Sequence, residues 1–160
     1  MRVVIAAVGR LKDGPERELF ERYRSRLEAS GRSLGWGPVQ VVEIAESRAS
    51  DVATRQNEEA ERLIAKAGEI GCKVVLDERG KHLTSEAFAA FLRGKREKGV
   101  RSLVFMIGGP DGQGAPALAG ADLKLSLGAM TLPHMLARVL LAEQLYRAAT
   151  ILTGHPYHRS

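Results

Sequence analysis

Short apolar runs alternate along the chain with longer stretches in which apolar residues recur every three or four positions. Five runs have the length and composition of buried strands: Arg2–Val8, Val39–Ile44, 73–76, Ser102–Ile107 and, more weakly, 123–127. The stretches between them predict helices over 15–28, 51–67 and 84–98, and Thr84 is a plausible N-cap for the third. This alternation predicts an α/β fold, with a mostly parallel sheet covered by helices on both faces.

The last helical pattern is the longest and covers 132–152. Thr131 can cap it, and Pro133 suits a first turn, where no backbone amide loses a partner. Its apolar stripe is wide and comprises Leu132, Met135, Leu136, Val139, Leu140, Leu145 and Tyr146. A stripe of this kind normally packs on the sheet, which is our prediction. Its length and methionine content also suit a contact between subunits.

The length of 160 residues and the apolar content of 44% predict one domain, residues 1–160, that can bury a core without metals or disulfides. Cys72 is the single cysteine, which excludes an internal disulfide and a multi-cysteine zinc site. No apolar stretch approaches the roughly 18 residues of a membrane span, and the apolar start is too short for a signal peptide. We therefore expect a cytoplasmic protein with no membrane contact.

Positive charge is concentrated in the second half of the chain. Residues 1–72 hold 12 Lys/Arg and 12 Asp/Glu, whereas residues 73–160 hold 12 Lys/Arg, 7 Asp/Glu and all four histidines. A basic face suggests an anionic partner, and RNA is the first candidate in a cytoplasmic protein. Simple solubility is the alternative, and the basic run from Arg93 to Arg101 suits a solvated helix end.

Two loops are candidates for a ligand site. Glycine-rich 108–114 directly follows a predicted buried strand, where ligands of open α/β sheets bind, although a tight turn alone is the alternative. The loop 126–131 combines small and apolar residues that suit a flat ring such as adenine. The chain lacks a G-x-x-x-x-G-K-[ST] loop and a G-x-S-x-G elbow, and Gly112 begins only a poor dinucleotide fingerprint. An NTPase, a serine hydrolase and a dinucleotide enzyme are therefore disfavoured.

The C-terminal tail is rich in groups that perform chemistry. His155 and His158 can exchange protons near neutral pH, Tyr157 offers a ring and a hydroxyl, and Arg159 can contact a phosphate. A metal held by both histidines and His134 is a weaker alternative, because no cysteine or clear carboxylate accompanies them. A tail that is structural or frayed is a further alternative.

Seven segments in this order resemble the ribosomal RNA large subunit methyltransferase H family, and the resemblance extends over essentially the whole chain. The segments are Leu76-Asp77 before Gly80-Lys81, 107–112, 125–127, 130–134, 138–140, 143–148 and 155–159. Gly128 stands where that family often has serine, and Asp111 where glutamate is common. The segments in the C-terminal half are highly specific, whereas the helices between 15 and 70 are generic.

The resemblance implies a fold of the SPOUT class with a C-terminal trefoil knot over about 73–160. It implies a homodimer with its site near the subunit interface, S-adenosylmethionine as cofactor and no metal. The implied reaction is methylation of N3 of a pseudouridine in 23S rRNA of the large subunit or the ribosome. By their place in the motifs, the cofactor contacts would be Leu76, Gly108, Leu127, Gly128, Ala129, Met130, Thr131 and Leu132.

For this reaction the base must lose its N3 proton, so a positioned proton acceptor would help. His158 is our first candidate for that proton or for orienting the base, and Tyr157 is a candidate for stacking or a hydroxyl contact. Arg159 and Arg138 are candidates for holding phosphates or stabilising the anion, and Asp111 for contacting the cofactor or orienting the tail. A non-catalytic ribosome-binding protein is the alternative from another class, and a metal hydrolase that uses the histidines is a weaker third.

Overall fold

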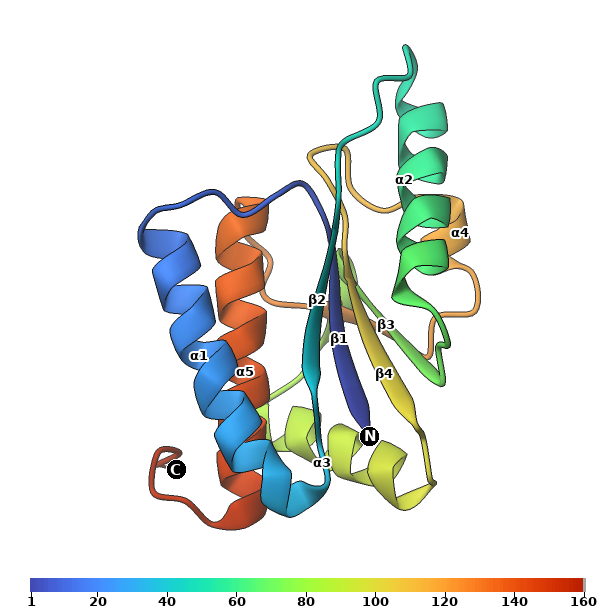
Figure 1. The fold of residues 1–160 in the computed structure, drawn as a ribbon. Coiled ribbons are helices and arrows are strands. Elements are labelled where there is room, and N and C mark those ends of the chain that lie inside the picture. The colour runs from blue at the N-terminus through green and yellow to red at the C-terminus, as the bar shows by residue number, and fades with distance from the viewer. Residues whose placement is uncertain (160) are drawn as a thin grey trace.

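A computed structural model describes residues 1–159, and its centre is a five-stranded sheet in the order β2-β1-β4-β3-β5 (Figure 1). Every neighbouring pair of strands is parallel. The strands are β1 (Arg2–Val8), β2 (Val39–Ile44), β3 (Cys72–His82), β4 (Ser102–Ile107) and β5 (Leu123–Ser126). The predicted α/β class and parallel sheet are therefore confirmed, whereas the knot stays a prediction.

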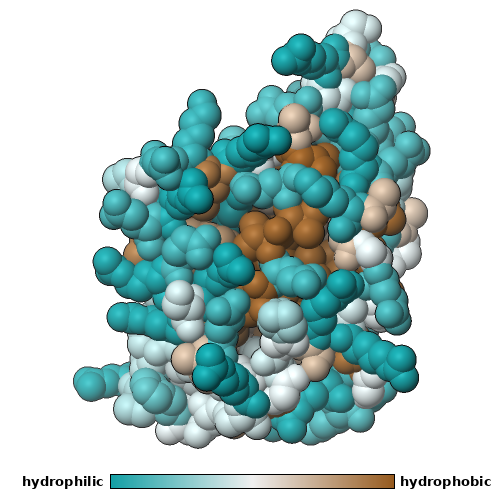
Figure 2. All heavy atoms as spheres, in the orientation of Figure 1, coloured by the Kyte–Doolittle hydropathy of each residue, from teal (hydrophilic) through white to brown (hydrophobic). Residues whose placement is uncertain are grey.

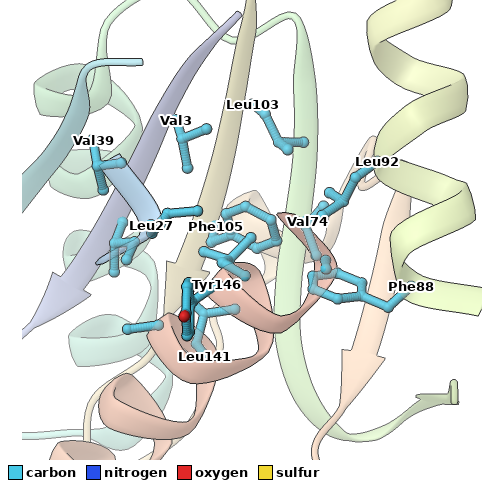
Figure 3. Packing of buried hydrophobic residues seen from close by; sticks show 14 of the residues in the cluster. Val3, Leu27, Val39, Val74, Phe88, Leu92, Leu103, Phe105, Leu141 and Tyr146 are labelled. Carbon is cyan, nitrogen blue, oxygen red and sulfur yellow. The ribbon is translucent and has the colours of Figure 1, made fainter. Parts of the chain in front are cut away.

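Helices cover both faces of the sheet and divide the core into two clusters. On one face lie α1 (Pro15–Gly31), α3 (Ser85–Glu97) and α5 (His134–Thr153), and on the other lie α2 (Val52–Ala67) and the short α4 (Ala115–Leu118). Figure 3 shows the first cluster, in which Phe105 of β4 lies near Leu141 of α5 and Phe88 of α3. The central strands are buried on both sides, which explains why they are continuous apolar runs.

Two of the helix starts follow from the local sequence. Thr84 caps α3, as predicted, by accepting a hydrogen bond from the Ala87 amide at 3.1 Å. Asp51 caps α2 in the same way through the Thr54 amide at 2.9 Å, so the helix begins one residue later than we predicted. The side chain satisfies an amide that has no partner within the helix.

The last helix starts later than predicted. The helix α5 begins at His134, with Pro133 as its N-cap, so Thr131 does not cap it and Leu132 belongs to a loop. Most of the predicted stripe packs in the core, but Leu136 and Leu140 stay 43% and 39% exposed. The apolar stripe is therefore wider than the surface that α5 buries against the sheet and α1. In residues 1–159, no helix is long and apolar enough to cross a membrane.

Strand β3 continues well beyond its predicted end at Leu76. Both Leu76 and Lys81 lie opposite Leu125 of β5, so the residues between them bulge out of the ladder. Gly80 makes this possible, because a Cβ there would lie 2.7 Å from the Lys124 backbone. The segment 77–81 is thus an irregular part of the strand that bulges at the carboxyl edge of the sheet.

Candidate active site

A cavity of about 650 Å³ lies where β3, β4 and β5 end. That volume is typical of small-molecule sites, and the carboxyl edge of a parallel sheet is where such ligands bind. Three loops and the start of α5 form its wall. The lining residues are Gln56, 76–79, 107–113, Leu125, Leu127, Gly128, 130–134 and Ala137.

The glycine-rich loop after β4 is folded tightly on itself. A Cβ on Gly108 would lie 2.7 Å from the Gly112 carbonyl oxygen, so only glycine fits there without moving the loop. Gln113 donates hydrogen bonds of 3.0 Å from its Nε2 to the carbonyls of both Leu76 and Met106. Its side-chain amide thereby joins the ends of β3 and β4 at the base of the cavity.

Helix α2 holds this loop from the opposite side. Arg55 Nε lies 2.8 Å from Asp111 Oδ2, and Gln56 Nε2 donates to the Asp111 carbonyl at 2.5 Å. The Arg55 guanidinium keeps the pKa of Asp111 below its usual range. Our sequence reasoning missed Arg55 and Gln56, because polar residues on a generic helix carry no motif. Asp111 therefore fixes the loop to α2, and within residues 1–159 of one chain it forms no hydrogen bond or ion pair with the tail.

The loop after β5 exposes its backbone to the cavity. The Ser126 hydroxyl donates to the Gly128 carbonyl at 2.9 Å and accepts from the Gly128 amide at 3.2 Å, which makes a tight turn. Gly128 has a φ of +142°, and an added Cβ would meet nothing within 4 Å. Every predicted cofactor residue except Ala129 lines the cavity, and Met130 is 84% exposed at its mouth. Their contact with a cofactor stays a prediction.

The cavity wall also carries charge of both signs. Asp77 and Glu78 lie in the bulge of β3, and the Asp77 side chain is only 12% exposed. It accepts a hydrogen bond from the Arg79 amide at 2.9 Å, whereas the Arg79 guanidinium, itself 86% exposed, lies 3.8 Å away. A weakly compensated carboxylate beside the cavity favours a ligand with positive charge, such as a sulfonium or an ammonium group.

Arg138 lies away from the cavity and from solvent. It is 1% exposed, its Nη1 lies 2.5 Å from Glu43 Oε2, and its Nη2 donates to the Gly9 carbonyl at 3.1 Å. Burial alone would raise the pKa of Glu43, but the Leu11 amide and Arg138 hold it below the ordinary value. A guanidinium enclosed in this way does not face a phosphate, so we assign Arg138 a different role below.

The C-terminal tail turns back from the end of α5 and docks against the middle of that helix and the start of α3, away from the cavity. The Tyr157 hydroxyl donates to Glu143 Oε1 at 3.0 Å, and its ring centroid lies 4.5 Å from that of Tyr146. Burial, together with the neighbouring Tyr23 and Glu143, raises the pKa of Tyr157 well above its ordinary value. His158 Nε2 lies 2.9 Å from Glu86 Oε1 on α3. These contacts order a segment that could otherwise fray.

One chain does not bring the tail and the cavity together. Figure 1 shows the tail turning back beside the lower part of α5, and none of its described contacts is with a residue that lines the cavity. His134 lines the cavity at the near end, so it is separated from His155 and His158. Throughout residues 1–159, no three His, Cys, Asp or Glu residues are grouped as metal ligands would be.

Comparison with known proteins identifies the class to which this sheet and cavity belong. Residues 1–158 match the model of a family described as predicted SPOUT methyltransferase, and the chain belongs to that family. More particularly, it is similar to proteins named ribosomal RNA large subunit methyltransferase H. It is 52% identical over 160 residues, the whole of both chains, to that of Rhodopseudomonas palustris strain BisA53. It is 52% identical over 159 residues, 99% of each chain, to that of Rhizobium etli. The resemblance seen in the motifs is thereby confirmed.

Proposed function

We propose that this protein uses S-adenosylmethionine to methylate N3 of a pseudouridine in 23S rRNA, acting as a cytoplasmic homodimer without a metal. The observation that carries the proposal is the cavity where β3, β4 and β5 end, around which the fold gathers Leu76, Gly108 and the loop after β5. These segments are distant in sequence, and they are the ones that carry the family resemblance. The names of the relatives, which specify a ribosomal RNA methyltransferase, support the reaction and substrate.

The cavity fits this cofactor in chemistry as well as in size. The backbone of the loop after β5 suits the adenine, the tight turn at Gly108 lets the main chain approach the ligand, and the carboxylate of Asp77 suits positive charge. When bound, S-adenosylmethionine supplies an electrophilic methyl group on a positively charged sulfur. The N3 lone pair forms the new bond to that methyl carbon, and the electrons of the carbon–sulfur bond remain on sulfur.

The protein must also take the N3 proton. His158 is our first candidate for this role, but in one chain it pairs with Glu86 on α3 and does not line the cavity. We therefore propose that the tail of a second copy supplies His158, with Tyr157 stacking on or bonding to the base and Arg159 holding a phosphate. His134 is the second candidate, because it lines the cavity of its own chain.

An exposed apolar surface supports the homodimer. Leu136 and Leu140 lie one turn apart on α5 and are partly exposed, and Met130 stands at the mouth of the cavity. Figure 2 shows a separate group of apolar spheres in the middle of one face, over the region where Figure 1 places β2. Burying such surface between two copies is favourable.

The decisive experiment incubates the protein with ribosomes that lack the modification and with cofactor carrying a labelled methyl group. We expect the label on one pseudouridine of 23S rRNA, mapped by digestion and mass spectrometry. Calorimetry with S-adenosylmethionine separates the two classes of function, because a non-catalytic RNA-binding protein would bind no cofactor. Label on another nucleotide would contradict the substrate, and absence of cofactor binding would contradict the enzyme.

A further inference from the structure

The loop between β1 and α1, residues 9–14, crosses the N-terminal end of α5 (Figure 1). That end of α5 forms part of the cavity wall through His134. The imidazole packs so closely on the loop that a Cβ on Gly9 would lie 3.4 Å from His134 Nε2. The loop therefore stands beside the cavity.

This loop is anchored at three points by its backbone. The Gly9 amide donates to the Ile44 carbonyl at 2.7 Å, and the Leu11 amide donates to Glu43 Oε2 at 2.7 Å. The Gly9 carbonyl accepts the bond from Arg138. Leu11 itself is 8% exposed and packs in the core. A short connection with this many fixed groups has one conformation.

The anchoring presents two cations to solvent. Arg10 and Lys12 flank the buried Leu11 and are both exposed. In the described part of the chain neither has an ion-pair partner, whereas the next cation, Arg17, is 2.8 Å from Asp13. Two unpaired cations at fixed positions beside the cavity suit the phosphates of a nucleic acid.

The ion pair that holds the loop loses hydration free energy when the protein folds. Arg138 and Glu43 form a largely buried pair, and Arg138 Nε is buried with no partner in residues 1–159. Desolvating two such charges often cancels their attraction, so a buried pair is weak evidence for stability. It is better understood as a means of selecting one loop geometry among several.

We infer that residues 9–14 bind the phosphate backbone of the substrate RNA through Arg10 and Lys12, and that Arg138 and Glu43 are positioning residues for this contact. The inference rests on the proposed function for the identity of the RNA. This RNA contact lies in residues 1–72, which hold equal numbers of basic and acidic residues. The loop and the cavity that receives the base then belong to the same chain.

The test compares Arg10→Ala/Lys12→Ala with Arg96→Ala/Lys98→Ala. The control removes two exposed cations from the end of α3, which leads into the N-terminal start of the central strand β4, whereas the cavity lies where the strands end. Binding to unmodified ribosomes is measured by co-sedimentation over a range of KCl at constant Mg²⁺. Each lost phosphate contact lowers the slope of log K against log salt by about 0.7–0.9, so the loop variant should lose about 1.5. Its affinity should fall about ten- to thirtyfold.

Cofactor affinity, measured by calorimetry, should stay unchanged in both variants. An equal loss in the control, or an unchanged slope in the loop variant, would overturn the inference. The titration needs no methyl transfer, so it tests the loop even if the wild-type protein modifies no RNA and the proposed function fails.

The positioning role is tested with Glu43→Gln and Arg138→Lys, which keep the approximate shape of each side chain. If these residues act through the loop, each variant by itself should lower the slope of log K against log salt. Combined with Arg10→Ala/Lys12→Ala, each should cause little further loss of RNA affinity. A purely structural role would lower the melting temperature and leave the salt slope unchanged. Additive losses of RNA affinity would also contradict the positioning role.

Discussion

The candidate site has two parts, the cavity at the start of α5 and the C-terminal tail that follows α5, and different kinds of contact hold each in place. At the N-terminal end, the cavity is made of backbone, glycines and loop ends that the sheet holds in place. The His155 amide joins the start of the tail to the Thr150 carbonyl, and beyond it the tail is held mainly by side chains, Tyr157 on Glu143 and His158 on Glu86. The cavity is thus formed by the sheet and its loops, whereas the tail packs on the outside of the helices.

This difference indicates how the enzyme divides its tasks. A close approach of backbone to a cofactor requires a rigid framework, and the parallel sheet supplies one. Proton transfer and RNA contact need side chains that meet a substrate from outside. Because the tail of one chain docks against the middle of α5 and away from the cavity, we propose that a second copy brings tail and cavity together.

The largest expected effect is at the cavity. Gly108→Val should abolish S-adenosylmethionine binding, because a Cβ there meets the Gly112 backbone at 2.7 Å and the turn must open. The matched control is Gly94→Val in α3, where an added Cβ meets nothing within 4 Å. Calorimetry on both folded proteins decides the matter. Wild-type affinity in a folded Gly108→Val protein would remove Gly108 from the site.

Removing the tail should separate binding from catalysis. Deletion of residues 157–160 should leave cofactor affinity nearly intact, since the tail docks away from the cavity. Methyl transfer should fall about 10²–10⁴-fold, the usual contribution of a positioned acid–base group. A truncated enzyme with full activity would refute the assignment of the tail.

The same deletion tests whether tail and cavity meet across a dimer. Neither Gly108→Val nor the truncated chain should be active alone, but a 1:1 mixture after subunit exchange should regain about a quarter of wild-type activity. Half of the dimers are then mixed, and each mixed dimer pairs one intact cavity with one intact tail. A mixture that stays inactive although light scattering shows mixed dimers would show that both halves must come from one chain.

A smaller effect is expected where α2 supports the cavity. Arg55→Met removes the pair with Asp111 and should weaken cofactor binding about fivefold, because a partly exposed pair contributes modestly. Arg62→Met is the matched control on the same helix, since Arg62 bonds to the Ala45 carbonyl outside the loop. Equal losses of affinity in the two variants would show a general effect of α2.

The smallest effect concerns how the tail is docked. Tyr157→Phe removes one hydrogen bond to Glu143 and should lower the free energy of unfolding by about 0.5–1.5 kcal/mol. Since the pKa of Tyr157 is raised in the fold, this contribution is complete below the ordinary tyrosine pKa of about 10 and is lost only as pH rises through the folded value. The difference between variant and wild type, measured by urea unfolding, should therefore be constant from pH 7 to 9. If the difference in unfolding free energy between Tyr157→Phe and wild type disappeared by pH 9, the assigned hydrogen bond and its pH dependence would be wrong.

The sequence alone determined the strand and helix pattern, the parallel sheet, the Thr84 cap and the motifs that reveal the family, because these depend on local spacing and on residue types with restricted uses. It also indicated almost all the residues that line the cavity. The resemblance did not assign Arg55 or Gln56, because their importance arises from a loop 55 residues further along the chain.

Only the tertiary structure decided what the ends of α5 face. Arg138 looked like a phosphate contact in the sequence, but the fold buries it against Glu43, 95 residues away. The same packing holds Arg10 and Lys12 beside the cavity, although the charges of their half cancel. A sequence count adds charges along the chain, whereas binding depends on which charges stay exposed at one place, and only long-range packing determines that.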